Sequence, residues 1–252
     1  MELYASNVVF LLGLIIGSFL NVAIARIPKN QSVAYPPSHC PLCEHSLKPI
    51  DLIPLFSFLL LKGRCRYCGA PISPRYPLVE AINAFLFLAV VWRFGLEWSI
   101  LVYFIVVSAL VVASFIDLKY LMIPDRIHVL LIVTFVVGNL MFQMIPWTDA
   151  LLGALVGSIP LFLVVLLTGG SGMGMGDVKL AFSLGWYLGM GGSLMMLFFS
   201  FIYGALISVF LLASKIKTKK DPIPFGPFIA LAFLTVLFWY ELLFYWYLGL
   251  IV

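Results

Sequence analysis

The stretch ILVYFIVVSALVVASFID, residues 100 to 117, contains no charged side chain before its last residue, Asp117. A run of this kind is typical of a helix that crosses a bilayer, which needs about 20 apolar residues. Of the 252 residues, 63% are hydrophobic and 10% are charged, whereas a soluble domain is about 45–50% apolar and about 25% charged. We therefore predict an all-α polytopic membrane protein and exclude a soluble one.

Similar apolar runs recur along the whole chain. The sixth is short, because Gly189, Gly191 and Gly192 interrupt it, so it could be a short helix, one of a tilted pair with the seventh, or partly re-entrant. No basic residue precedes the first run, which predicts a retained span rather than a cleaved signal peptide. We predict about eight transmembrane helices near residues 7–25, 78–94, 97–116, 127–145, 148–168, 178–190, 193–214 and 227–250.

The basic residues indicate how the chain is oriented, because Lys and Arg concentrate in cytoplasmic loops. With the N-terminus outside, 14 of the 15 Lys and Arg residues lie in cytoplasmic segments, and Arg93 is the exception. We interpret the basic run from Lys215 to Lys220 as a cytoplasmic anchor rather than a nucleic-acid site, because the run is short. The long loop 26–77, the end of the third span and the glycine-rich stretch before the sixth are then all cytoplasmic.

All four cysteines lie in that long loop, as two C-x₂-C knuckles separated by 21 residues: Cys40 and Cys43, then Cys65 and Cys68. Two such knuckles are typical of a tetrahedral zinc site. Two disulfides or free thiols are the alternative, although disulfides rarely persist in the cytosol. His39 and His45 are alternative ligands, but four cysteines already complete a tetrahedron. We expect a structural zinc ion whose binding supplies the folding free energy of this Pro-rich loop.

Acidic residues are rare in the apolar part of the chain, because a charge at the bilayer centre costs about 2.5–3.5 kcal/mol on insertion scales. Asp117 directly follows the third span, and Asp125 follows Pro124. Asp177 ends the stretch GSGMGMGD, residues 170–177, at the start of the sixth span. Glycine removes side-chain bulk, so we expect Gly174 and Gly176, supported by Lys179, to let an extended peptide lie across Asp177.

Two carboxylates held close together share one proton, so that one acts as a base and the other as an acid. This pairing suits peptide hydrolysis by an activated water without a covalent intermediate. Taken singly, Asp117 could pair with Lys119 or Arg126, and Asp177 could cap a helix. The glycines lack the Gly-Lys-Ser/Thr ending of a phosphate-binding loop. A transporter would place its acids near the midplane, and a zinc-ribbon scaffold would leave the glycine stretch without a role.

Several motifs together resemble the bacterial type IV prepilin peptidases, which are membrane aspartic proteases with a Gly-x-Gly-Asp signature that also methylate their product. The resemblance covers almost the whole chain. It implies that Asp117 and Asp177 are the catalytic pair, with Asp125 a nearby acid outside it. The matching motifs are GSFLNVAIARIP (17–28), CPLC (40–43), GRCRYCGAPIS (63–73), RYPLVE (75–80), IDLKYLMIPD (116–125), GMGDVKL (174–180) and PFGPFIALA (224–232).

The resemblance also implies the substrates and the second activity. Prepilins or pseudopilins would lose a short basic leader at the cytoplasmic face of the bacterial inner membrane, and S-adenosylmethionine would then methylate the new amino terminus. We expect residues 1–96 to be the methyltransferase-associated region, in which Glu80 either takes part or simply pairs with Arg75, and residues 97–252 to be the six-span peptidase domain. A Gly-x-Gly-Asp protease without methyltransferase activity and a secondary transporter are the alternatives.

Overall fold

The structure is a computed structural model that describes residues 2–170, 172–218 and 221–249. Within these described residues, seven helices are long and apolar enough to cross a membrane, and the short elements η1, η2 and α2 lie in the loop that follows α1. The elements are α1 (Glu2–Arg26), η1 (Ile27–Lys29), η2 (Pro49–Leu52), α2 (Phe56–Leu60), α3 (Arg75–Phe94), α4 (Ile100–Tyr120), α5 (Asp125–Phe142), α6 (Trp147–Thr168), α7 (Met175–Ala213) and α8 (Gly226–Gly249).

These helices confirm the predicted all-α membrane fold. The chain forms two compact units, Met1–Val112 and Ala113–Val252, and the boundary between them lies within α4. Three predicted segments reach residues outside the described ones, namely Ser171 in the glycine stretch, Lys219 and Lys220 in the basic run, and Leu250 in the last span.

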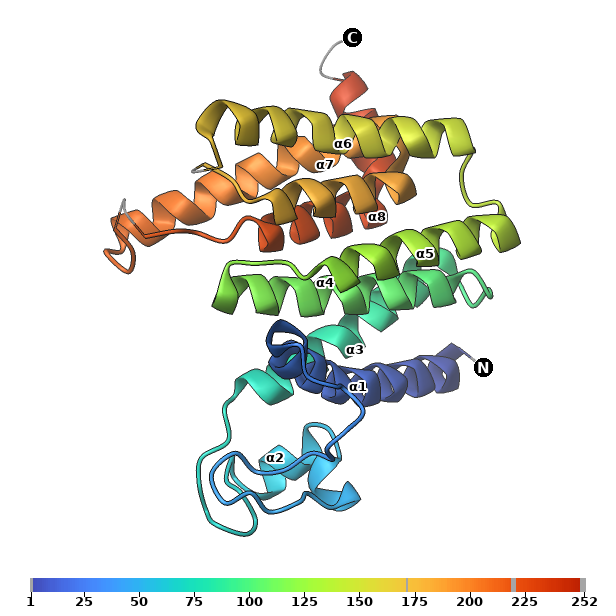
Figure 1. Ribbon diagram of the computed structural model, residues 1–252. Coiled ribbons are helices and arrows are strands. Elements are labelled where there is room, and N and C mark those ends of the chain that lie inside the picture. The colour runs from blue at the N-terminus through green and yellow to red at the C-terminus, as the bar shows by residue number, and fades with distance from the viewer. Residues whose placement is uncertain (1, 171, 219–220, 250–252) are drawn as a thin grey trace. The chain divides into compact units, whose positions relative to one another are not determined.

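In the first unit, α1 and α3 lie side by side through small residues (Figure 1). A Cβ atom at Gly13 would lie 2.6 Å from the Ala84 Cα, and one at Gly17 would lie 2.7 Å from the Glu80 Cα. Gly13 and Gly17 are four residues apart, so they form the Gly-x-x-x-Gly pattern that allows close helix packing in membranes. The two helices therefore run antiparallel, with Gly17 opposite Glu80.

In the second unit, the same device joins α6 to α7. A Cβ at Gly185 would lie 2.6 Å from the Gly153 carbonyl carbon and 2.7 Å from the Ala154 Cα. No larger residue fits at this crossing without separating the helices, so the glycines allow the close packing of α6 on α7.

The element α7 is two helices, because the backbone at Gly189 is non-helical with φ 66°. A Cβ at Gly157 on α6 would lie 3.2 Å from the Ala181 carbonyl oxygen and 3.7 Å from the Ser193 Cβ. These two residues would be about 18 Å apart along a straight helix. The chain therefore turns back at Gly189 (Figure 1), and the two halves of α7 correspond to the predicted sixth and seventh spans.

Candidate active site and metal centre

Asp117 lies in the last turn of α4 and its side chain is buried, with 5% of the residue exposed. The Gly226 N–H at the start of α8 donates a hydrogen bond of 3.0 Å to the Asp117 Oδ2. Leu121, directly after the helix, has φ 54°, which ends α4 and turns the chain towards Ile123. A residue far along the chain thus holds this carboxylate in place.

Asp177 is the third residue of α7 and is also buried, with 8% of the residue exposed. Gly174 caps the helix in an extended conformation, and its carbonyl oxygen accepts the Asp177 N–H at 3.2 Å. The first turn of a helix favours a negative charge, because unpaired N–H groups point out of it. Asp177 lies in this first turn of α7.

Ile123 connects the surroundings of the two acids. A Cβ at Gly176 would lie 3.4 Å from the Ile123 Cβ. At Gly226, a Cβ would lie 2.9 Å from the Ile123 Cδ1 and 2.8 Å from the Asp117 Oδ2. The two carboxylates are near enough for the charge of Asp117 to act on Asp177. The structure thus brings both predicted acids into one buried cluster of the second unit.

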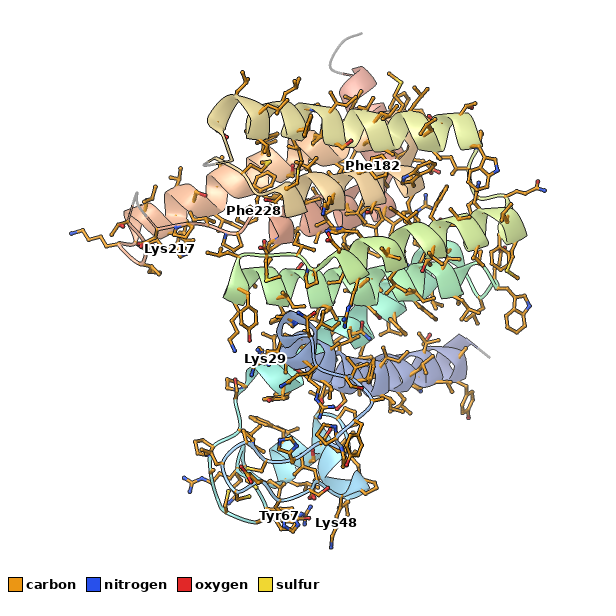
Figure 2. The ribbon with its side chains drawn as sticks, in the orientation of Figure 1. Lys29, Lys48, Tyr67, Phe182, Lys217 and Phe228 are labelled. Atoms are coloured by element: carbon orange, nitrogen blue, oxygen red, sulfur yellow. The ribbon has the colours of Figure 1, made fainter. Side chains whose placement is uncertain are left out.

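A cavity of about 370 Å³ lies beside the first half of α7, where Val178 and Phe182 line it. At its wall lies His128, which is 4% exposed and has no partner in hydrogen-bonding geometry for either ring nitrogen. His128 was not among the residues predicted from the sequence, although an ionisable residue within an apolar span is a signal of function. Phe182 is the wall residue labelled in Figure 2. The remaining lining residues are Asp125, Val129, Ile132, Ser158, Met175, Lys179 and Ser183.

The four cysteines form one cluster, in which the sulfur atoms all lie within 4.8 Å of one another. Each knuckle is closed by an isolated bridge, His39 to Ser46 for the first and Arg64 to Pro71 for the second. The sulfurs of Cys40 and Cys68 are 3.9 Å apart, close to the edge of about 3.8 Å that a tetrahedron of 2.3 Å zinc–sulfur bonds requires. All four thiols are free, so the geometry fits a metal ion rather than the disulfide alternative.

The surroundings of the thiols also suit a metal ion. Hydrogen bonds from the Cys43 and Leu42 N–H groups lower the pKa of Cys40 to about 6. The Ala70 N–H lowers the pKa of Cys68, but burial and the three neighbouring sulfurs outweigh it and raise this pKa to about 12. Four thiolates this close repel one another unless a cation joins them. The cluster can therefore hold a metal ion that removes these protons.

The second knuckle is fixed by Asp51, whose side chain is 4% exposed. Asp51 accepts hydrogen bonds from the Arg66 Nε at 2.6 Å, the Tyr67 hydroxyl at 2.9 Å and the Lys48 N–H at 3.1 Å. Lys48 and Tyr67 accordingly lie close together in the loop (Figure 2). Burial raises the pKa of Asp51, but the bonds from Arg66 and Tyr67 outweigh it and keep this pKa below its usual 3.8. Asp51 thus ties residues inside the knuckle to the η2 turn.

Comparison with known proteins places these features in a family. Residues 104–209 match the model described as the type IV leader peptidase family, and residues 11–94 match the bacterial peptidase A24 N-terminal domain. The chain belongs to the type IV leader peptidase family. Relatives named prepilin leader peptidase/N-methyltransferase include those of Xanthomonas campestris (39% identical, covering 90% of this chain and 89% of the relative), Aeromonas hydrophila (37%, 96% and 93%) and Pseudomonas aeruginosa (34%, 91% and 88%). No solved structure matches the chain.

Within this leader peptidase fold, the second acid of the motif IDLKYLMIPD lies apart from the buried cluster. Asp125 accepts a hydrogen bond of 2.6 Å from the Lys179 Nζ, and the two side chains are 73% and 49% exposed. An exposed ion pair of this kind adds little stability. Lys179, which we predicted to support substrate binding, therefore has Asp125 as its partner in this structure.

Gly226 gives a direct test of the cluster in this leader peptidase. We expect Gly226→Val to lower the rate of leader cleavage by about 10²-fold, because no side chain fits between the Asp117 Oδ2 and Ile123; a 1 Å misplacement can have this effect. Purified variants would be compared for cleavage rate and for thermal unfolding. The matched control is Gly95→Val, because a side chain at Gly95 would extend into open space. The backbone there has φ 73°, which strains valine, but cleavage should be much less affected than in Gly226→Val. Equal cleavage by Gly226→Val and wild type would contradict the role of this contact.

Proposed function

We propose that the protein cleaves the leader from prepilins or pseudopilins and then methylates the new amino terminus. The single observation that supports this proposal most strongly is the buried pair Asp117 and Asp177, which Ile123 and Gly226 enclose at the ends of α4 and α7. The names of the relatives describe both activities. The substrate would be a membrane-anchored peptide with a leader on the cytoplasmic side.

In the cleavage step, the ionised carboxylate takes a proton from water and the protonated carboxylate polarises the scissile carbonyl. The Gly226 N–H engages one oxygen of Asp117, so it restricts that carboxylate to one orientation. Water attacks the carbonyl carbon, and the proton then passes to the leaving amine. No covalent intermediate with the protein is required.

The methyl donor would be S-adenosylmethionine, which supplies an activated methyl group when bound. The four-cysteine cluster would hold zinc in a structural role, because all four tetrahedral positions are taken by sulfur and none remains for a substrate. Residues 1–96 would be the methyltransferase-associated region and 97–252 the peptidase domain. The protein would lie in the inner membrane with its N-terminus outside, since this orientation leaves 14 of 15 basic residues in the cytoplasm.

The proposal is tested by incubating the purified protein with a model prepilin, with and without S-adenosylmethionine, and weighing the products. We expect loss of the leader in both reactions and addition of one methyl group to the mature product only with the donor. An intact substrate in both reactions would refute the peptidase. Cleavage without methylation would refute the second activity alone.

A further inference from the structure

The first unit contains a buried carboxylate that the peptidase does not use. Glu80 lies in α3, one of the membrane-spanning helices, and is 7% exposed. Its Oε2 accepts a hydrogen bond of 2.8 Å from the Leu55 N–H, and the Ser18 hydroxyl also bonds to the carboxylate. Among the described residues no Lys or Arg side chain interacts with it. Buried carboxylates are normally paired with a cation or with strong donors, so Glu80 lacks a positive partner.

A second acceptor without a partner lies within one helical turn of Glu80. Asn21 on α1 is 3% exposed and its Oδ1 has no hydrogen-bond partner. Its Nδ2 donates to the Tyr76 carbonyl at 3.1 Å and to the Gly17 carbonyl at 3.3 Å. Tyr76 is one turn before Glu80 on α3, and Gly17 packs directly on the Glu80 backbone. Hence a carboxylate without a cation and an amide oxygen without a donor lie in the same small region.

Asn83 shows what a buried polar side chain looks like when all its hydrogen-bonding groups have partners. Asn83, also in α3, donates to the Gly13 carbonyl at 2.8 Å and accepts the Ser108 hydroxyl at 3.0 Å. Both its amide nitrogen and its amide oxygen have partners within the first unit, so Asn83 has a complete structural explanation. Glu80 and Asn21 do not, and an unpaired buried polar group costs about 1–3 kcal/mol.

A primary ammonium group matches the two acceptors in charge and in its N–H donors. On this basis, and resting on the proposed function, we infer that Glu80 and Asn21 bind the new amino terminus of the cleaved pilin and that Glu80 is the base of the methylation step. Two observations place this site near the cytoplasmic loop. Glu80 is five residues, about 8 Å, from the start of α3, and its hydrogen-bond partner Leu55 belongs to that loop.

The amine reaches Glu80 by displacing the Leu55 N–H. It has φ 59° and ψ −50°, a combination that costs a non-glycine residue about 1–3 kcal/mol. The bond to Glu80 holds Leu55 in this conformation. An incoming ammonium competes with the Leu55 N–H for the same oxygen, and release of Leu55 relieves the strain.

In the reaction, Glu80 removes one proton from the ammonium and leaves a free amine. The amine lone pair forms the new nitrogen–carbon bond to the methyl group as the sulfur–carbon bond of the sulfonium donor breaks. The electron pair of that bond stays on sulfur, which becomes a neutral thioether. The product is a secondary ammonium, and the proton on Glu80 passes to water.

The test uses the full-length protein and a pre-cleaved pilin peptide, so that methylation is measured apart from leader cleavage. Glu80→Gln keeps an oxygen for the Leu55 N–H but lacks the charge and the basicity. We expect methylation to fall by about 10²–10⁴-fold, the usual contribution of a general base, while cleavage of an intact prepilin stays within about twofold. Glu97→Gln, which changes an exposed acid of the same unit, should change neither.

A binding measurement separates a catalytic role from a structural one. Wild-type protein should bind the free-amine peptide at least about tenfold more tightly than its N-acetyl form, since the acetyl group removes the charge. Glu80→Gln should lose this preference. Normal methylation by Glu80→Gln, a retained preference for the free amine, or equal loss of cleavage would each overturn the assignment.

Asn21→Leu keeps the inference testable if Glu80→Gln does not fold. It keeps the branched shape of the side chain but removes the unpaired oxygen together with the Nδ2 bonds to the Tyr76 and Gly17 carbonyls, so thermal unfolding is measured alongside. It should raise the KM for the free-amine peptide several-fold with a smaller change in kcat. An unchanged KM would overturn the role of Asn21. Failure of the proposed function looks different, because wild-type protein would then leave the prepilin uncut or the pre-cleaved peptide unmethylated.

Discussion

Asp117→Asn or Asp177→Asn should each abolish leader cleavage, lowering kcat by about 10³-fold or more, within the range of general acid–base catalysis. Asparagine has the shape of aspartate but can neither share the proton nor take one from water. The Asp117→Asn variant can still accept the Gly226 N–H through its side-chain oxygen, so the fold should be retained. The measurement is the single-turnover rate of leader removal from a model prepilin, with thermal unfolding as the check on folding.

The matched control is Asp125→Asn, which changes an acid in the same motif that lies outside the buried cluster and pairs with Lys179. Its cleavage rate should stay within a few-fold of wild type. The double variant of Asp117 and Asp177 should be no slower than the slower single variant, because residues that act as one unit are not additive. Normal cleavage by either single variant would remove that residue from the pair.

The spans were predictable because their apolar runs are long, but their ends were not. Hydropathy placed the third span at 97–116, whereas α4 continues to Tyr120, since a helix extends beyond the apolar layer and carries Asp117 and Lys119 in its last turn. The three glycines correctly indicated a break between the sixth and seventh spans. Among them, Gly189 has the left-handed backbone that reverses the chain.

The surroundings of the acids were less accessible to sequence reasoning. The alternating glycines predicted open space beside Asp177, but Gly176 packs against Ile123. The bond from Gly226 to Asp117 joins residues 109 positions apart, and no local pattern specifies such a contact. The hydrogen bond from Leu55 to Glu80 depends on a backbone conformation that leucine rarely adopts, so nothing in the sequence indicated it.

Loss of the metal should have the second large effect. Cys65→Ser or Cys40→Ser should reduce bound zinc from one ion per chain to nearly none, because a structural site of this kind binds with about 10–16 kcal/mol of apparent free energy that also folds the loop. Metal content and protease sensitivity of residues 39–71 are the measurements. Methylation should fall as well, since the loop that the metal folds borders the Glu80 site at Leu55.

The matched control is His45→Ala, which removes the tilted ring contact of His45 with Tyr67, whose ring centroids are 3.7 Å apart, but no sulfur. Zinc content should remain at one ion per chain, because the four sulfurs complete the tetrahedron. A loss of zinc in this variant would make His45 a ligand and contradict the four-cysteine site. Stoichiometric zinc in a variant with all four cysteines changed to serine would place the metal elsewhere in the chain.

Leader cleavage should survive the loss of the metal, because Asp117, Asp177 and Gly226 all belong to the second unit. A metal-free variant that stays in the membrane should therefore still cut the prepilin but leave its new amino terminus unmethylated.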